Sequence, residues 1–372
     1  MLLCGTPEDK AIEMGPILPA VSPNRYVVSA LESLLKEPNA EKLLQYSSNQ
    51  YNTRQRMMGA KWLAKSGIDI NYQHILLASG GQNALTAILS GFFQPGDKLG
   101  CDIFTYPGLK SAAKLLGIVL VPISDYSKNS LEAIHKQYHL KGIYLIADYG
   151  NPTTDTLRIS VRKTIAAFIQ KHDILLLEDG INALLSKELT PPLYSYAPNH
   201  TIYFSSLSKT IAPGLRIAYM VAPERYEDTL AGALYNMNVS VSSLLAQTAA
   251  TLIQSGTADK ILTERKVLTK KRNQLVNMYL KDYKVHGDDY CSFRWLILPK
   301  GYKSHDFELL AKASSLHVFA ADRFLVGSTL PFEAVRISIV SEEDDKNFEL
   351  GLLKLKDLLE HLTYQKENPE FL

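Results

Sequence analysis

The sequence predicts an α/β protein with a mostly parallel sheet and a second, smaller α+β layer. Three observations carry this prediction. The chain has 372 residues, which is enough for two domains. Between about residues 60 and 225, short aliphatic or β-branched runs alternate with amphipathic stretches at helical spacing. The runs are almost continuously apolar, as is typical of parallel strands covered by helices on both faces.

Seven of these runs predict the strands of the larger sheet, and helical patterns such as 83–93 and 161–172 lie between several of them. In chain order the runs are 74–79, 97–103, 117–123, 142–148, 173–179, 201–206 and 215–222. Residues 225–280 are predicted as long helix, and we expect the Lys and Arg residues after position 259 to form a solvated face.

The C-terminal part predicts the smaller layer. Runs at 293–298 and 334–340 are predicted strands, and 342–362 is a predicted closing helix. We therefore expect a large domain over residues 46–280 and a small domain over 281–372, with an N-terminal arm, 1–45, that joins the small domain.

Composition excludes several classes of protein. Forty Lys and Arg against thirty-eight Asp and Glu give a net charge of +2, so the chain carries no sign of a nucleic-acid partner. Cys4, Cys101 and Cys291 are too few and too scattered for a disulfide framework or a zinc cluster, so we expect no metal site and a reducing compartment. The apolar runs are shorter than the ~20 residues of a membrane helix, and acids come too early for a signal peptide. The sequence therefore predicts a cytoplasmic protein with no membrane partner.

Polar residues and glycines follow the predicted strands, and open parallel sheets bind ligands at the carboxyl ends of their strands. Taken singly, each has an ordinary explanation as a turn residue, a cap or a surface side chain. Together, an amine, a carboxylate, an aromatic ring, an anion-binding turn and an arginine are the parts of a pyridoxal phosphate (PLP) site. These residues are Gly80, Gly81, Gln82, Tyr106, Asn151, Asp179, Ser206, Ser208, Lys209 and Arg216.

The chemistry of the cofactor assigns a role to each group. Lys209 is expected to form a Schiff base with the aldehyde, and Asp179 to keep the pyridine nitrogen protonated. Tyr106 can stack on the ring. Backbone N–H groups at a helix start, two hydroxyls and a guanidinium suit the phosphate. For the phosphate we expect Gly80, Gly81, Gln82, Ser206, Ser208 and Arg216.

Six segments carry a resemblance to a known family. SLSKTIAPGLRIAYM, at 206–220, resembles the Schiff-base segment of class I/II aminotransferases, which are fold-type I PLP-dependent transferases. The other segments are similar to the family's phosphate loop, ring-stacking, Asn-Pro, pyridinium-partner and carboxylate-binding segments. They are SGGQNAL (79–85), FTYPG (104–108), GNPTTDTL (150–157), LLLEDG (175–180) and EAVRISIV (333–340).

The resemblance implies a function and further site residues. It implies a homodimeric enzyme of amino-acid metabolism that transfers an amino group between an amino acid and a 2-oxo acid. Arg336 and Asn151 would bind the substrate, with Arg336 on its α-carboxylate. Tyr46 would reach the phosphate of the neighbouring subunit. Lys209, once freed, would move a proton between the substrate's Cα and the aldehyde carbon of the cofactor.

The N-terminal third resembles a narrower group. EMGPILPAVSPN (13–24), LLQYSSNQY (43–51) and AKWLAKSGIDI (60–70) are similar to the aminotransferase-like half of MocR-type regulators of the GntR family. Those proteins carry a winged helix-turn-helix before this fold, and the residues before position 12 are too few to form one. The alternative to an enzyme is therefore an effector domain that binds PLP and an amino acid with little turnover.

One departure from the family affects the expected rate. The family usually has a tyrosine shortly after the pyridinium-partner aspartate, whereas this chain reads Asp179, Gly180, Ile181, Asn182. The amide of Asn182 can donate to the cofactor's phenolic oxygen in its place, but it does not titrate like a phenol. We therefore expect slow transamination, and elimination or racemisation on the same fold remain open. The sequence has no P-loop, HExxH, CxxC or nucleophile-elbow motif in support of another chemistry.

Overall fold

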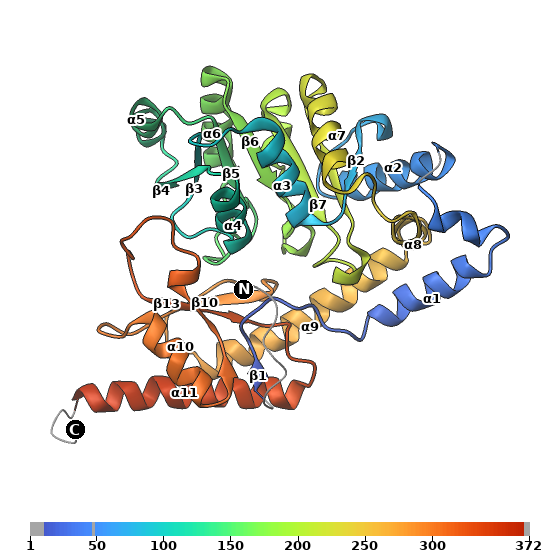
Figure 1. The fold of residues 1–372 in the computed structure, drawn as a ribbon. Coiled ribbons are helices and arrows are strands. Elements are labelled where there is room, and N and C mark those ends of the chain that lie inside the picture. The colour runs from blue at the N-terminus through green and yellow to red at the C-terminus, as the bar shows by residue number, and fades with distance from the viewer. Residues whose placement is uncertain (1–10, 47–48, 368–372) are drawn as a thin grey trace.

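The computed structural model describes residues 11–46 and 49–367, and its largest unit is a seven-stranded sheet (Figure 1). The strands lie in the order β2-β8-β7-β6-β5-β3-β4. Each of the seven predicted runs contains one of them. Their bounds are β2 Leu76–Ala78, β3 Lys98–Asp102, β4 Val119–Ile123, β5 Gly142–Leu145, β6 Leu175–Asp179, β7 Thr201–Ser206 and β8 Ala218–Val221.

The sheet is mostly parallel, as predicted. Strands β4, β3, β5, β6 and β7 pair in parallel, while β8 runs antiparallel to both β7 and β2. The connection from β7 to β8, residues 207–217, contains no crossover helix, so the chain returns beside β7 in the opposite direction. This short return carries Lys209 and Arg216 past the end of the sheet.

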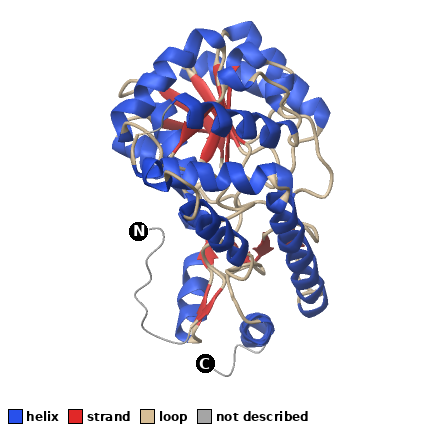
Figure 2. Cartoon of the chain, turned by 90° about the vertical axis from the view of Figure 1, so that its right-hand side faces the viewer, coloured by secondary structure: helices blue, strands red, loops and turns tan. Residues whose placement is uncertain are grey.

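Helices cover both faces of the sheet (Figure 2). Neighbouring residues of β6 show the alternation, because Leu177 packs with Ile88 of one helical layer and Leu176 packs with Ile169 of the other. The covering helices include α3 Gly81–Phe92, α4 Pro107–Leu115, α5 Lys128–Tyr138 and α6 Ile159–His172.

The stretch predicted as one long helix is three helices: α7 Glu224–Asn238, α8 Ser243–Gln254 and α9 Thr257–Tyr279. The breaks lie at Val239 and Gly256, whose φ angles of 59° and 77° are left-handed and end a helix. The expected solvated face of α9 holds for its exposed lysines, but it is wrong for Arg265 and Arg272, which are buried.

The smaller layer is a four-stranded antiparallel sheet in the order β12-β13-β10-β9. In Figure 1 it lies below the large sheet, with α9 running past both and α10 and α11 beside it. β1 pairs in parallel with β11 in a separate two-stranded sheet, and the N–H of Ser338 on β13 donates to the Met14 carbonyl, so residues 12–14 contact this layer. The bounds are β1 Ile12–Glu13, β9 Val285–His286, β10 Phe293–Ile297, α10 Ser304–Ala313, β11 Leu316–His317, β12 Phe319–Ala320, β13 Ala334–Ser338 and α11 Asp345–Glu367.

Two further helices, α1 Asn24–Leu35 and α2 Asn49–Ala64, pack against α8. The domain limits at residues 45 and 280 remain a prediction. Short 3-10 helices occupy Ala40–Leu44, Tyr72–His74, Ala183–Leu185, Leu193–Ser195, Pro198–His200, Pro213–Leu215 and Ala321–Arg323.

Three observations on the described residues concern membrane helices, metal-binding clusters and cysteines. No helix in residues 11–46 and 49–367 is long and apolar enough to cross a membrane. Within the same ranges no cluster of His, Cys, Asp and Glu is arranged to hold a metal ion. Cys101 and Cys291 are buried free thiols, and Cys4 lies outside the described residues.

Candidate active site

Asp179 is the last residue of β6, and its carboxylate is held at the carboxyl end of the large sheet. The side chain is 6% exposed. Tyr144 Oη on β5 donates to Asp179 Oδ2 at 3.0 Å, and the backbone N–H of Ile181 donates to Oδ1 at 3.1 Å. Burial raises the pKa of Asp179 to about 7, although both hydrogen bonds act to lower it. A buried carboxylate of this kind is suited to pair with a protonated ring nitrogen.

Lys209 lies in the loop after β7, and its Nζ donates to the backbone carbonyl of Ile17 in the N-terminal arm. Burial lowers the pKa of Lys209 to about 8, and the positive charges of Arg336, Arg265 and Arg216 act in the same direction. A lysine with a lowered pKa is more often neutral, and the neutral amine is the nucleophile.

The start of α3 provides a cradle for an anion. Gly80 caps this helix with a φ of 92°, and a Cβ added there would collide with the Arg216 guanidinium. Close approach of the guanidinium therefore requires a residue without a side chain. The first N–H groups of the helix have no intrahelical partner, so Gly81 and Gln82 present donors beside Arg216.

Two hydroxyls complete this end of the site. Ser206 Oγ and Ser208 Oγ lie 2.8 Å apart, and the Ser208 N–H donates to Ser206 Oγ at 3.2 Å. Ser206 packs directly against the α3 start, because a Cβ on Gly81 would lie 3.4 Å from its own. Arg216 is exposed, and its Nη2 donates to the Ser79 carbonyl at 3.1 Å. Together these groups can bind a phosphate.

Tyr106 is the N-cap residue of α4. Gln82 Nε2 donates to the Gly108 carbonyl at 3.1 Å, which ties the α3 start to this helix. Burial raises the pKa of Tyr106, and the charge of Asp179 adds to the shift while Arg216 and Arg336 oppose it. The ring is therefore close enough to sense all three charges, as a ring-stacking residue would be.

Arg336 on β13 forms the side of the site that belongs to the smaller layer. It is 4% exposed, and its Nη1 and Nη2 donate at 2.7 Å to Asn151 Oδ1 and to the Gly15 carbonyl. Its Nε has no partner among the described residues. The guanidinium carbon lies 4.9 Å from the ring centre of Phe324. Burial lowers the pKa of Arg336 to about 9. A carboxylate would provide the missing acceptor and the missing charge.

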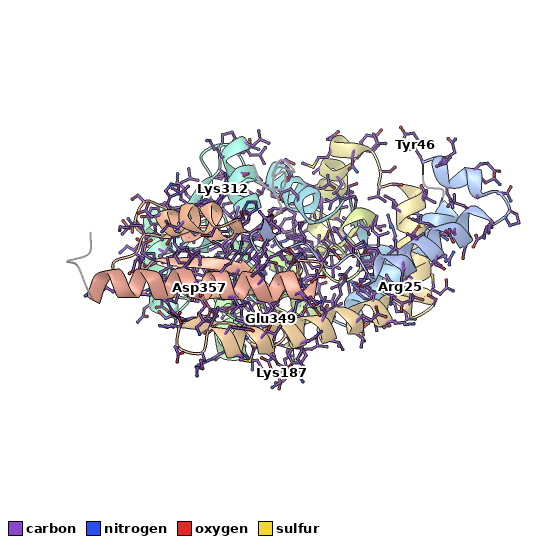
Figure 3. All side chains as sticks on the ribbon, turned by 90° about the horizontal axis from the view of Figure 1, so that it is seen from below. Arg25, Tyr46, Lys187, Lys312, Glu349 and Asp357 are labelled. Carbon is purple, nitrogen blue, oxygen red and sulfur yellow. The ribbon has the colours of Figure 1, made fainter. Side chains whose placement is uncertain are left out.

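Asn182 and Tyr46 lie differently from the other predicted residues. The buried Asn182 donates through Nδ2 to the Tyr149 carbonyl at 2.8 Å, so it braces the segment that leads to Asn151. Tyr46 is 75% exposed, at the rim of the molecule in Figure 3. The structure thus brings every predicted site residue to one edge of the sheet except Tyr46, whose predicted role needs a second subunit.

Three contributors were not predicted from the sequence: Tyr144, Arg265 and the backbone carbonyls of the arm. Tyr144 pairs with Leu177, two residues before Asp179, so the period-2 alternation of strands puts it on the same face as the carboxylate. That alternation was a usable signal for Tyr144. No sequence signal existed for the arm carbonyls, because every residue carries one.

The donor set fits PLP. A buried carboxylate, an amine of lowered pKa, a glycine cradle and an arginine with an unpartnered Nε surround one edge of an α/β sheet. Fold and site together define a PLP-dependent protein of fold type I. Residues 24–349 match the family described as aminotransferase class I and II, so the chain belongs to this family of PLP-dependent transferases. The predicted family, fold class and cofactor are confirmed.

The relatives include both regulators and enzymes. The chain is 39% identical over 366 residues to the uncharacterized HTH-type transcriptional regulator YdeF of Bacillus subtilis, a match over 97% of this chain and 79% of that protein. It is 24% identical over 297 residues to the 2-aminoadipate transaminase of Thermus thermophilus, over 76% and 73% of the two chains.

Solved structures show the same fold. The crystal structure of LysN, an alpha-aminoadipate aminotransferase of Thermus thermophilus complexed with N-(5'-phosphopyridoxyl)-L-leucine, superposes with a TM-score of 0.85 at 22% identity. The superposition covers 95% of this chain and 93% of that one.

Proposed function

We propose that the chain is a working aminotransferase that moves an amino group between an amino acid and a 2-oxo acid. The observation that carries this proposal is the meeting of Lys209, Asp179 and Arg336 at one sheet edge. Burial lowers the pKa of the Lys209 amine, while Asp179 and Arg336 have no partner of opposite charge among the described residues, so each can pair with a charge of the cofactor or the substrate. Lys209 and Asp179 are the catalytic residues, and Arg336 and Asn151 bind the substrate.

PLP, when bound, supplies an electron sink for the pair of electrons left on the substrate's Cα. Asp179 would hold the proton on the ring nitrogen, with its carboxylate oriented by Tyr144. Tyr106 would pack on the ring face. The phosphate would be held by Gly80, Gly81, Gln82, Ser206, Ser208 and Arg216.

Lys209 performs the proton transfer. Its Nζ would take the proton from the substrate's Cα and return it at the aldehyde carbon of the cofactor. A pKa near 8 suits both directions of transfer at neutral pH. Arg336 fixes the α-carboxylate through its planar fork, and Asn151 holds that fork at 2.7 Å. Binding of the α-carboxylate would thereby position the Cα proton next to the Nζ of Lys209.

We also propose a symmetric homodimer in the cytoplasm. Large apolar side chains are exposed on the N-terminal segment that carries Tyr46, among them Leu35 at 58% and Leu44 at 74%. Burial of this surface by a second copy would cover them and carry Tyr46 toward the neighbour's phosphate. Sedimentation that shows a monomer would contradict the dimer. The buried free thiols of Cys101 and Cys291 fit a reducing compartment.

A second candidate function is an amino-acid-sensing effector domain with little turnover. It is favoured by Asn182, which lies where the family usually has a tyrosine. One N–H of its amide already donates to the Tyr149 carbonyl. The relative YdeF is itself described as a transcriptional regulator. Both functions share the site, and they differ in whether the bound amino acid reacts.

The test is reconstitution with PLP followed by borohydride reduction and peptide mapping, which should label Lys209. A label on another lysine would contradict the site. Single amino acids are then added, and the visible band is followed before and after a 2-oxo acid. Loss and recovery of the band support the aminotransferase, whereas a band that persists while the amino acid binds supports the effector. Turnover on the order of 10 per second would contradict the slow rate expected from Asn182.

A further inference from the structure

Five arginines of the described residues are buried, and ion pairs divide them into two groups. Three have a carboxylate partner within 4.0 Å, as a buried charge normally requires. These pairs are Arg162 with Asp148 at 2.6 Å, Arg272 with Asp345 at 2.9 Å and Arg294 with Asp289 at 3.9 Å. Arg265 and Arg336 have no such partner in the described part of the chain.

Both unpaired arginines are neighbours of Lys209 along the N-terminal arm. Arg336 donates to the carbonyl of Gly15, Lys209 to that of Ile17, and Arg265 to that of Ala20, the last at 3.1 Å. Three cations thus bind three carbonyls within six residues of the arm. These carbonyls satisfy hydrogen bonds but bring no negative charge. The carboxylates of Glu343 and Glu264 act on Arg265 only from beyond ion-pair distance.

Arg265 and Lys209 also line the same cavity, of about 170 Å³, between the arm and α9. The remaining lining is mostly apolar and includes Ile17, Leu185 and Val340. Its one carboxylate among the described residues, Glu264, is paired with Arg25 at 2.9 Å. A water molecule takes about 30 Å³ in the liquid, so the cavity has room for a short side chain with a polar end. Arg265 is 5% exposed, and burial lowers its pKa to about 10.

The guanidinium of Arg265 has donors to spare. Nε and Nη2 both donate to the Ile211 carbonyl, and Nη1 donates to Ala20. A guanidinium has five N–H groups, so these three bonds leave one hydrogen on each terminal nitrogen. Two terminal N–H groups on one fork match the two oxygens of a carboxylate.

We propose that Arg265 binds a second negative charge of the ligand, the distal carboxylate of an acidic amino acid or of its 2-oxo acid, while Arg336 binds the α-carboxylate. The inference rests on the proposed function, because it assigns the two ends of one ligand. It makes Arg265 a specificity-determining residue contributed by the same chain as Lys209.

The first test needs no variant. The affinity of the PLP-loaded protein is measured by calorimetry for three acids and their neutral counterparts: aspartate with asparagine, glutamate with glutamine, and 2-aminoadipate with norleucine. A carboxylate on a buried guanidinium should make at least one acid bind about tenfold more tightly than its counterpart. Ratios near one in all three pairs would overturn the inference.

Variants then assign the preference to one side chain. Arg265→Gln should bring the acid-to-neutral ratio to about one, and Arg265→Lys should retain part of it because the charge remains. Arg272→Gln is the matched control, since Arg272 is a buried arginine on the same helix, and it should leave the ratio unchanged. The ratio is insensitive to a general loss of stability. Full acid preference in Arg265→Gln would contradict the assignment, and if that variant does not fold, the wild-type ratios decide.

The outcomes also separate this inference from the proposed function. Tight binding of neutral amino acids with no acid preference would overturn the Arg265 site alone. Failure of every amino acid to bind would overturn both. Inorganic phosphate is added to the glutamine titration to detect a free anion in the cavity. If phosphate raises the affinity for glutamine to that for glutamate, Arg265 binds free anions and the distal-carboxylate assignment is wrong.

Discussion

Glu178 and Asp179 are neighbours on β6, and they are alike in burial and in pKa. Their side chains are 1% and 6% exposed, and burial raises the pKa of each to about 7. They point to opposite faces of the sheet. Glu178 accepts from the N–H groups of Leu193 and Tyr194, each at 2.8 Å, so both of its oxygens hold one loop in place.

Asp179 differs in position rather than in charge or burial. It ends the strand at the sheet edge where Lys209 and Arg216 also lie, and one of its two partners is a tyrosine hydroxyl instead of a loop amide. A raised pKa therefore fails to separate a structural carboxylate from a catalytic one in this protein. The surrounding groups separate them, and four measurements can break or sharpen that distinction.

The largest expected effect is on the pH dependence of stability without cofactor. Asp179 has a pKa of about 7 in the folded chain and about 3.9 when unfolded, so between these values only the folded state holds the proton. The stability of the wild type contributed by this group is present below pH 4 and lost as the pH rises to 7. Asp179→Asn lacks that loss, so its free energy of unfolding relative to that of the wild type should rise by about 4 kcal/mol from pH 4 to pH 8. Glu178 is present in both proteins, so its titration does not affect this difference. If urea denaturation gives the same change of unfolding free energy with pH for both proteins, the raised pKa of Asp179 is contradicted.

The next effect concerns the loop that Glu178 holds. Glu178→Ala leaves the N–H groups of Leu193 and Tyr194 without acceptors and should lower the free energy of unfolding by about 2–4 kcal/mol at pH 5. That pH is chosen because Glu178 is then mostly protonated in the folded chain, so removal of its charge adds little. PLP affinity of the folded fraction should be unchanged, and a large loss of affinity would remove the contrast with Asp179.

Asp179→Ala should show the opposite pattern. Loss of a charge-assisted hydrogen bond, about 1.5–3 kcal/mol, should weaken PLP binding and slow α-proton exchange by roughly ten- to a hundredfold. Equilibrium dialysis and exchange of the Cα proton into deuterated water measure the two effects. Exchange rates equal to those of the wild type would contradict the role of Asp179.

The smallest effect is expected at Tyr144. Tyr144→Phe removes one donor to Asp179, worth about 1 kcal/mol, so PLP affinity should fall by roughly fivefold and the pKa of Asp179 should rise further. The pH dependence of PLP binding reports both changes. If the affinity falls while its pH dependence stays fixed, Tyr144 contributes to packing and not to the state of the carboxylate.

The sequence could predict the strand-end residues because the carboxyl ends of parallel strands meet whatever their order. Asp179, Ser206 and Lys209 needed only that rule. Tyr144 and Arg265 lie inside elements, where an apolar strand and a charged helix have ordinary explanations. Arg265 lies four residues after Ile261 and four before Thr269, so helical spacing places it on the same buried face as those two residues. Its partners, the carbonyls of Ala20 and Ile211, are far away in sequence, and only the tertiary fold reveals them.

The N-terminal arm enters into competition with any ligand that binds beside it. Its carbonyls at Gly15, Ile17 and Ala20 take hydrogen bonds from the three cations that an anionic ligand would also use. A bond to a carboxylate is roughly twice as strong as one to a neutral carbonyl, so an anion displaces the arm wherever the two would use the same N–H group. By thermodynamic linkage, if an anionic ligand favours release of the arm by some factor, then release of the arm raises the affinity for that ligand by the same factor. The arm therefore lines the site and also sets how tightly the ligand binds.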